Sequence, residues 1–223
     1  MVNIEANKKL ILTKIQRVRR NSDFSKLPSP KLVAVSKKQE EHKIELAIKS
    51  GQKFFGENRV QEAQKRWEKR LEIYEDIELR LIGPLQTNKT GQALNLFDVI
   101  ETIDREKLVK EIAKNFNNSL KTKSFYIQVN TGSEPQKSGL IPSEVDTFIS
   151  YCTDDLKLPI NGLMCIPPQD EEPSMHFAFL KKIAKRNNLT ELSMGMSNDF
   201  EEAIKFGATS VRIGSLFFGA REL

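Results

Sequence analysis

Two patterns of hydrophobic and polar positions alternate along the whole chain. Short runs rich in β-branched and aromatic residues are typical of strands. Between them lie longer segments in which apolar residues recur every three or four positions, as in Leu108, Ile112 and Phe116, which is the spacing of an amphipathic helix. This alternation of strands and helices predicts a parallel sheet with helical crossovers.

The number of strand-like runs decides the type of sheet. Eight runs qualify, and eight parallel strands with intervening helices are the composition of a (β/α)8 TIM barrel. We therefore predict an α/β fold with a single barrel domain over residues 1–223, preceded by an extra N-terminal helix at about Ile4 to Arg20. The predicted strands are Lys31 to Lys37, Lys53 to Gly56, Leu79 to Gly83, Asp98 to Thr102, Ser124 to Asn130, Ile160 to Cys165, Glu191 to Met194 and Ser210 to Gly214.

Residues at the predicted helix ends agree with this division. Asp104 can cap the helix that follows it, and Ser197 or Asn198 can cap the helix after the seventh strand. Gly51 and Gly207 stand where two helices should end, because glycine readily adopts the backbone conformation found there.

Composition and charge narrow the class of protein. Hydrophobic residues make up 39% and charged residues 29%, which is typical of a soluble globular chain. The net charge of +5 could favour nucleic acid, but basic runs such as Arg17 to Arg20 lie in predicted helices. No nucleic-acid-binding module or set of stacking aromatics accompanies them, so we predict no nucleic-acid partner.

Membrane and metal sites are also not predicted. No run approaches the roughly 20 apolar residues of a membrane helix, and the first residues lack the apolar core of a secretory signal. We therefore expect a cytoplasmic protein without membrane contact. Cys152 and Cys165 have no paired Cys or His nearby, so we interpret them as ordinary buried thiols.

The carboxyl ends of barrel strands are where such folds carry their sites, and the first strand ends in Lys37. Strand alternation places Val33, Val35 and Lys37 on one face. If that face is the barrel interior, partial desolvation favours the neutral amine and makes it a nucleophile toward an aldehyde. A solvated rim charge is the more ordinary role of such a lysine, and Lys38 should point the other way.

The ends of the last two strands suggest a phosphate grip. Arg212 should point into the barrel, where a buried cation needs a partner such as a structural carboxylate. Gly214 and Ser215 offer backbone N–H groups and a hydroxyl at the start of a short helix, and Ser197 follows the seventh strand. Barrel closure would place this phosphate roughly 5–10 Å from Lys37.

Several segments resemble, in order and over nearly the whole chain, the signature segments of the pyridoxal 5'-phosphate (PLP) homeostasis protein family. They are Val33 to Lys37, Phe55 to Glu62, Leu81 to Lys89, Leu192 to Ser197 and Val211 to Gly214.

The resemblance implies an alanine-racemase-like barrel without the racemase's second domain, with PLP held as a Schiff base on Lys37 and Arg212 facing the pyridine nitrogen. It further implies phosphate contacts from Ser197, Gly214 and Ser215, and a ring-side contact from Asn58. As an Asn after Gly-Glu at a strand end, Asn58 could equally cap a helix. Pro84 is a departure, since many relatives carry a histidine there, so any imidazole role at that position is in doubt.

These residues favour a protein that holds a cofactor over a working enzyme. Arg212 disfavours a proton on the pyridine nitrogen, which leaves the ring a weak electron sink. The second acid–base group of racemases belongs to their other domain, and the sequence offers no replacement. We predict a monomer that binds PLP in PLP and amino-acid homeostasis, with amino acids or apo-PLP enzymes as further partners, no metal and no catalytic residue.

Two other functions stay open. The chain could be an active amino-acid racemase whose second base comes from a partner subunit. It could also be a phosphosugar-type barrel enzyme in which Lys37 forms a Schiff base with the substrate and the phosphate grip holds that substrate.

Overall fold

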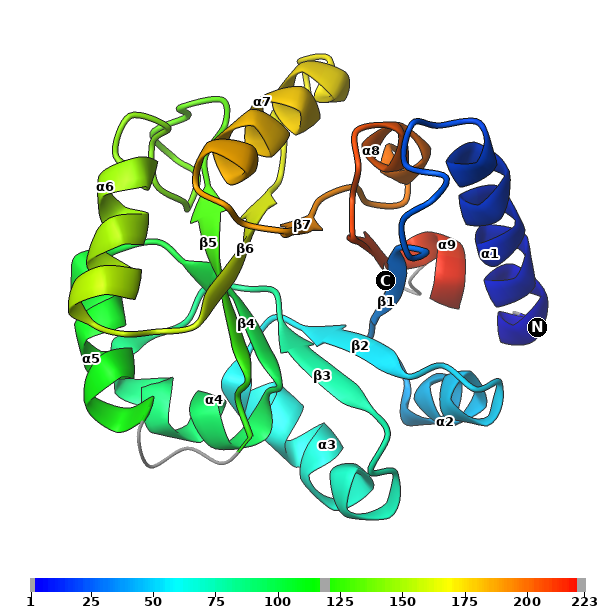
Figure 1. Cartoon of the computed structure of the whole chain (residues 1–223). Helices are drawn as coiled ribbons and strands as arrows, with labels where there is room; N and C mark the ends of the chain where they lie inside the picture. Colours follow the sequence, from blue (N-terminus) through cyan, green and yellow to red (C-terminus); the bar gives the residue numbers. More distant parts are fainter. Residues whose placement is uncertain (1–2, 117–120, 220–223) are drawn as a thin grey trace.

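Eight parallel strands close into a barrel in chain order, with β8 paired back to β1 (Figure 1). The structure is a computed structural model and describes residues 3–116 and 121–219. The strands are β1 (Lys31–Val35), β2 (Phe54–Glu57), β3 (Glu78–Leu81), β4 (Val99–Ile103), β5 (Ser124–Val129), β6 (Ile160–Cys165), β7 (Glu191–Ser193) and β8 (Ser210–Ile213).

The helices form the outer layer of the barrel (Figure 1). The α-helices are α1 (Ile4–Arg20), α2 (Glu41–Lys49), α3 (Val60–Ile73), α4 (Thr90–Leu96), α5 (Glu106–Phe116), α6 (Val145–Ser150), α7 (Pro173–Arg186), α8 (Phe200–Lys205) and α9 (Ser215–Phe218). A 3-10 turn, η1 (Thr87–Lys89), precedes α4, and a π-helical turn, η2 (Tyr151–Asp155), follows α6. The predicted (β/α)8 barrel with its N-terminal helix is confirmed.

Helix α1 lies against α8 and α9 on the outside of the barrel (Figure 1). Asn3 caps it by accepting the Ala6 N–H at 2.9 Å. Ile11 and Ile15, one turn apart, are fully buried. The helix predicted at about Ile4 to Arg20 therefore packs on the barrel through an apolar face.

The first strand ends earlier than the sequence suggests. We predicted a strand to Lys37, but β1 ends at Val35. The Ser36 N–H still donates to Gly56 O (3.0 Å), and the Gln39 N–H then folds back to Ser36 O (3.1 Å). Lys37 therefore lies in a turn beyond the strand, because the ladder to β2 is replaced by this local hydrogen bond.

The cap of α8 also differs from the prediction. Neither Ser197 nor Asn198 caps it, because the helix begins at Phe200 and Asp199 is its N-cap residue. The Asp199 carboxylate accepts the Met196 N–H at 2.5 Å. That contact closes a turn through Ser197 and Asn198 and delays the helix. The helix-end glycines agree with the prediction, since Gly51 and Gly207 follow α2 and α8 with φ of 77° and 92°.

The two faces of the sheet have different surroundings. Outward residues such as Leu32, Phe55 and Val211 join one continuous apolar layer under the helices. The inward face carries a small apolar cluster of Val99, Tyr126 and Met164. The remaining interior is largely polar, which is unusual because a buried charge is tolerated only when it is paired.

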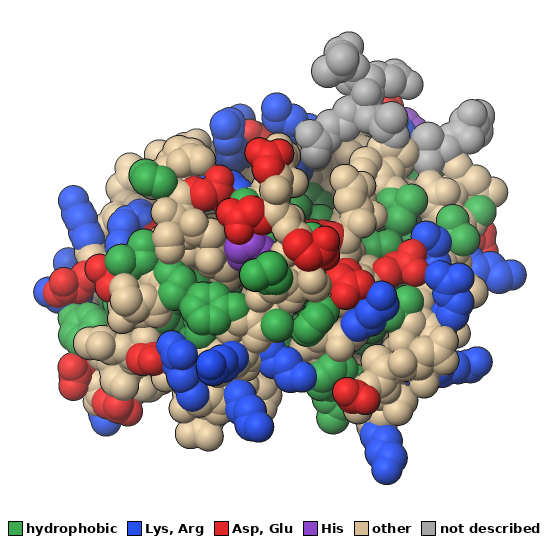
Figure 2. Space-filling model, turned by 90° about the horizontal axis from the view of Figure 1, so that it is seen from above, with side chains coloured by type: hydrophobic (Ala, Val, Ile, Leu, Met, Phe, Trp, Pro, Cys, Tyr) green, Lys and Arg blue, Asp and Glu red, His purple; other side chains and the backbone are tan. Residues whose placement is uncertain are grey.

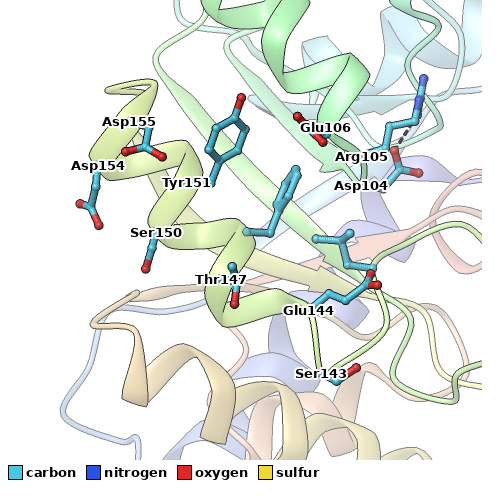
Figure 3. A pocket seen from close by; sticks show the side chains of 12 residues that line it. Asp104, Arg105, Glu106, Ser143, Glu144, Thr147, Ser150, Tyr151, Asp154 and Asp155 are labelled. Atoms are coloured by element: carbon cyan, nitrogen blue, oxygen red, sulfur yellow. Dashed lines mark hydrogen bonds and ion pairs between the residues drawn. The ribbon is translucent and has the colours of Figure 1, made fainter.

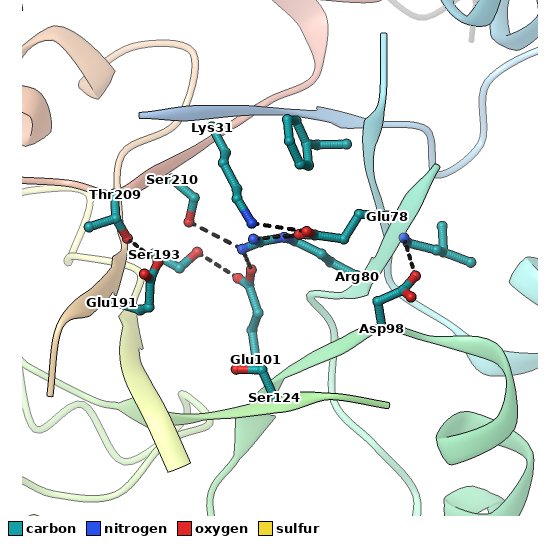
Figure 4. Close-up of polar contacts among 12 residues, drawn as sticks. Lys31, Glu78, Arg80, Asp98, Glu101, Ser124, Glu191, Ser193, Thr209 and Ser210 are labelled. Carbon is teal, nitrogen blue, oxygen red and sulfur yellow. Dashed lines mark hydrogen bonds and ion pairs between the residues drawn. The ribbon is translucent and has the colours of Figure 1, made fainter. Parts of the chain in front are cut away.

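A chain of buried charges fills the barrel interior (Figure 4). Arg80 and Glu101 are 1% and 0% exposed and form an ion pair at 2.8 Å. Arg80 also pairs with Glu78 at 2.6 Å, and Glu78 reaches Lys31 at 2.9 Å near the amino end of the barrel. Although burial opposes its charged form, the Glu101 carboxylate raises the pKa of Arg80 above its ordinary value. The Arg80 guanidinium therefore keeps its charge in the core, paired with Glu101.

Removing one member of this pair should strongly destabilise the barrel. In Glu101→Ala the buried Arg80 loses its carboxylate, and breaking a buried pair in this way costs about 3–5 kcal/mol. Urea unfolding followed by circular dichroism measures the loss. Glu202→Gln, which disrupts the exposed contact to Lys205, is the control and should change the free energy of unfolding far less. Equal losses in the two variants would contradict the assignment.

Candidate functional site

Lys37 and Asn58 lie on neighbouring loops at the carboxyl rim of the barrel. Val35 pairs with Gly56 in register. Lys37 follows Val35 by two positions, and Asn58 follows Gly56 by two positions. Adjacent strands are about 4.8 Å apart. Lys37 is half-buried and Lys38 is exposed, which agrees with their predicted opposite directions.

Val33 lies on the face of β1 that points into the barrel. Val33 pairs with the inward residue Arg212, and a Cβ placed on Gly56 would lie 3.1 Å from Val33 Cγ1. Ser36, on the other face, donates to Glu57 beneath α3 at 2.7 Å. The interior face of β1 thus carries Val33 and Val35. Lys37 follows in the turn beyond the strand, and its direction toward the mouth stays a prediction.

Arg212 is buried at the centre of the barrel with two fixed partners. Its side chain is 4% exposed and donates to Ser193 Oγ at 2.7 Å and to Cys165 O at 2.8 Å. Ser193 in turn donates to Glu101 Oε2 at 2.5 Å. Among the described residues, the carboxylate partner expected for Arg212 is therefore reached through a serine hydroxyl and not by direct contact. A fixed positive charge results below the mouth.

The phosphate-grip residues converge as predicted. Ser197, after β7, and Ser215, after β8, have hydroxyl oxygens 3.4 Å apart. The backbone N–H of Arg212 donates to Gly195 O at 2.9 Å and connects β8 to the loop after β7. A Cβ on Gly214 would meet nothing closer than Val35 at 3.6 Å. A side chain at this position would therefore be in ordinary van der Waals contact with β1.

Asn58 is held by backbone packing and carries an unused acceptor. Its Oδ1 is buried and has no hydrogen-bond partner among the described residues. A Cβ on Gly83 would come within 2.4 Å of Asn58 O, so only glycine fits at that position. Thr102 donates to Gly83 O at 2.8 Å and fixes this loop. A buried acceptor without a partner indicates a missing donor, which fits a polar ligand at the mouth.

The predicted residues therefore lie at or just beyond the carboxyl ends of β1, β2, β7 and β8, and their chemistry fits a small phosphorylated aldehyde. An amine at the rim, a buried cation below it and two adjacent hydroxyls are the required groups. Pro84 is exposed and lines a cleft of about 500 Å³ beside Asn58, together with Arg59 and Lys89.

Sequence reasoning missed two supports of this site. Glu101 and Ser193 connect to Arg212, but neither was selected as a candidate. A signal was present: Glu101 is the charged residue of the fully buried strand β4, on the same alternation as the inward Val99. A charged residue on the inner face of a buried strand predicts a paired cation inside the barrel.

A larger cleft lies away from the predicted residues. It has a volume of about 910 Å³ and lies between α5 and α6 (Figure 3). Carboxylates of Glu106, Glu144 and Asp154 line it around Tyr151. None of the predicted site residues lines this cleft, so its size does not identify it as the cofactor site.

Other sequence expectations concern thiols, metals and charge. Cys152 and Cys165 are buried thiols, as predicted, and burial raises the pKa of Cys165 to about 12. Within residues 3–116 and 121–219 no cluster of three or more potential metal ligands occurs, and no helix there is long and apolar enough to cross a membrane. On the face shown in Figure 2, basic side chains are interspersed with acidic ones.

Known proteins share both the sequence and the barrel. The family described as "Alanine racemase, N-terminal domain" matches residues 12–222. The pyridoxal phosphate homeostasis protein of Haemophilus influenzae is 35% identical and aligns with 99% of this chain and 97% of its own length. That of Aquifex aeolicus is 37% identical over 86% of this chain and 87% of its own.

Solved structures give the same result. PipY of Synechococcus elongatus, solved with PLP bound, has a TM-score of 0.76 at 32% identity and covers 92% of this chain and 100% of its own. Alanine racemase of Clostridium difficile has a TM-score of 0.70 at 12% identity and shares the fold, but only 58% of its chain is covered. The chain therefore belongs to the alanine racemase N-terminal domain family and, within it, to the pyridoxal phosphate homeostasis proteins.

Proposed function

We propose that this chain is a single PLP-binding barrel that holds the cofactor reversibly on Lys37 and serves PLP and amino-acid homeostasis without robust catalysis. The observation that supports the proposal is the pairing of β1, which precedes Lys37, with β8, which carries the buried Arg212 and is followed by the Ser215 hydroxyl beside Ser197. The PLP-bound structure of PipY, a relative covered over its whole length, supports the choice of ligand.

Each residue has a distinct part in holding the cofactor. The Lys37 amine would condense with the aldehyde of PLP, with release of water, to give a Schiff base that an incoming amine can replace. Ser197 and Ser215 donate hydroxyl hydrogens to the phosphate, and the backbone N–H groups beyond Gly214 add to them. Asn58 Oδ1, which lacks a donor, accepts one from the cofactor's ring side.

Arg212 limits what the bound cofactor can do. PLP supplies an electron sink whose strength depends on a proton at its pyridine nitrogen. The Arg212 guanidinium is positively charged, and all its polar atoms are hydrogen-bond donors, so it cannot accept a proton or a hydrogen bond from the ring. Its contacts to Ser193 and Cys165 O hold it in place, so it disfavours that proton by charge repulsion.

The described histidines and tyrosines lie away from the loops that carry the site, although Asp199 stands in the loop after β7. The two histidines lie in α2 and α7, and Tyr126 lies on the inner face near the Arg80 pair. Tyr74 and Tyr151 follow α3 and α6 on the outside. None lies in the loops after β1, β2, β7 and β8 that carry the site. This supports a cofactor carrier, which we further propose acts as a cytoplasmic monomer with amino acids or apo-PLP enzymes as exchange partners.

Borohydride reduction of the PLP-loaded protein should fix a pyridoxyl group on Lys37, because this amine faces the mouth. Peptide mapping by mass spectrometry locates the label. Lys38→Ala is the matched control and should label normally, whereas Lys37→Ala should not label. Label on Lys38 in the wild type, or no label, would overturn the assignment.

Arg212→Glu should change the pH dependence of the bound cofactor's absorption spectrum, because a carboxylate favours a proton on the ring nitrogen. Ser215→Ala is the comparison: it removes one hydrogen bond to an anion, worth about 1.5–3 kcal/mol, so it should weaken PLP binding about ten- to a hundredfold and leave the spectrum intact. A spectral titration that is the same in all three proteins would show that Arg212 does not face the ring.

The proposed function itself predicts exchange without turnover. PLP-loaded protein should pass its cofactor to an apo-enzyme, while added alanine or other amino acids keep their chirality and release no keto acid. Chiral chromatography and an apo-enzyme reactivation assay follow the two processes in parallel. Repeated turnover at ordinary enzymatic rates, dependent on Lys37, would instead establish the racemase-like alternative.

A further inference from the structure

Lys37 lies in a turn whose backbone conformation needs support from outside the turn. The Gln39 N–H donates to Ser36 O at 3.1 Å, so Lys37 and Lys38 are the two central residues of a β-turn. Lys38 has φ of +58°, in the left-handed region that residues with a side chain rarely adopt. Turns with a positive φ at the third position normally carry Gly or Asn there. An outside contact must therefore hold this turn in shape.

Arg66 of α3 supplies that contact from behind the strand. Its Nη1 donates to Ser36 O at 3.1 Å and its Nη2 donates to Gln39 O at 3.2 Å. These are the carbonyls of the first and last residues of the turn. One planar guanidinium thus bridges both ends of the segment that carries Lys37, a geometry that matches the fixed fork of arginine.

Arg66 is itself fixed in the core. Its Nη1 lies 2.9 Å from Glu57 Oε1, and the Arg66 and Glu57 side chains are 13% and 0% exposed. The same Glu57 oxygen accepts from Ser36 Oγ at 2.7 Å and from the indole N–H of Trp67 at 3.1 Å. Trp67 is fully buried against Phe55. The brace therefore connects the turn to the rigid layer between β2 and α3.

We propose that Arg66 is a positioning residue for Lys37: it holds both ends of the Ser36–Gln39 turn and so fixes where the Lys37 amine meets the cofactor. This inference rests on the proposed function, because it concerns the same lysine. Arg66 lies on the far side of the strand from the mouth and does not touch the cofactor. It acts by reducing the backbone freedom of the residue that does.

The same helix provides a matched control. Arg70, one turn after Arg66, is 17% exposed and pairs with Glu41 and Glu45 at 2.7 and 2.6 Å. Arg66 also pairs with Glu41, at 3.0 Å. The two arginines therefore share burial, helix and an acidic partner, but Arg70 has no hydrogen bond to the Ser36–Gln39 turn among the contacts described. Substituting each by methionine separates support of the turn from general stabilisation by α3.

The first measurement follows cofactor retention. PLP-loaded wild type, Arg66→Met and Arg70→Met are mixed with excess apo-enzyme, and the loss of bound PLP is timed by its absorbance. We expect Arg66→Met to release PLP about tenfold faster than the wild type, which corresponds to about 1.4 kcal/mol, and Arg70→Met to stay near the wild-type rate. Melting temperatures of the variants show whether stability alone explains the difference.

The second measurement needs no cofactor. Amide hydrogen exchange of Gln39, read by NMR, reports directly on the turn's own hydrogen bond to Ser36 O. It should accelerate in Arg66→Met and not in Arg70→Met. If Arg66→Met does not fold, Arg66→Lys takes its place: lysine keeps the charge beside Glu57 but cannot bridge two carbonyls, so Gln39 exchange and PLP release should still both rise.

The outcomes separate this inference from the proposed function. A wild type that takes up no PLP on Lys37 overturns the proposed function, and Gln39 exchange then still decides whether Arg66 holds the turn. A wild type that takes up PLP, together with Arg66 variants that match it in release or in Gln39 exchange, overturns the inference alone. Equal changes in Arg66→Met and Arg70→Met also overturn it, because they would indicate only loosening of α3.

Discussion

The buried pairing of Arg80 with Glu101 is the contact on which the interior of this barrel depends. One oxygen of Glu101 accepts from Arg80 and the other accepts from the Ser193 hydroxyl. Ser193 Oγ in turn accepts from Arg212. The cation beneath the mouth is thus fixed by residues from β3, β4 and β7 together. A barrel filled only with aliphatic side chains could not keep a guanidinium there, since a buried charge needs compensation within reach.

Much of this architecture follows from local pattern. Period-two spacing locates the strands, and helical spacing locates α1. Alternation along the strands correctly predicts that Val33 and Arg212 point inward. Both patterns depend only on residues close together in the sequence. The Glu101–Ser193 contact joins residues 92 positions apart. Only barrel closure brings them together, so no local window of sequence contains it.

The errors at the rim have the same origin. Lys37 leaves the strand because Gln39 bonds back to Ser36, and that turn depends on Arg66 in the next helix but one. Asp199 takes the N-cap position of α8 in place of Ser197, because its carboxylate accepts the Met196 N–H and holds Ser197 in the turn before the helix. In both places several polar groups can make the same local hydrogen bond, and tertiary contacts decide which of them makes it. The inward position of Arg212 and the closeness of Ser197 to Ser215 could be predicted from the sequence, whereas the backbone conformation around Lys37 could not.

The strand that supports Arg212 also carries a sulfur atom, and its burial has a chemical consequence. Cys165 gives its carbonyl to Arg212 and keeps its thiol in the core with a pKa of about 12. The thiolate is the form that attacks aldehydes and reacts with peroxides, and at neutral pH almost none of it exists here. Cys165 belongs to the apolar layer under the helices, so its sulfur is inert there and mild oxidation should not disturb the carbonyl that holds Arg212.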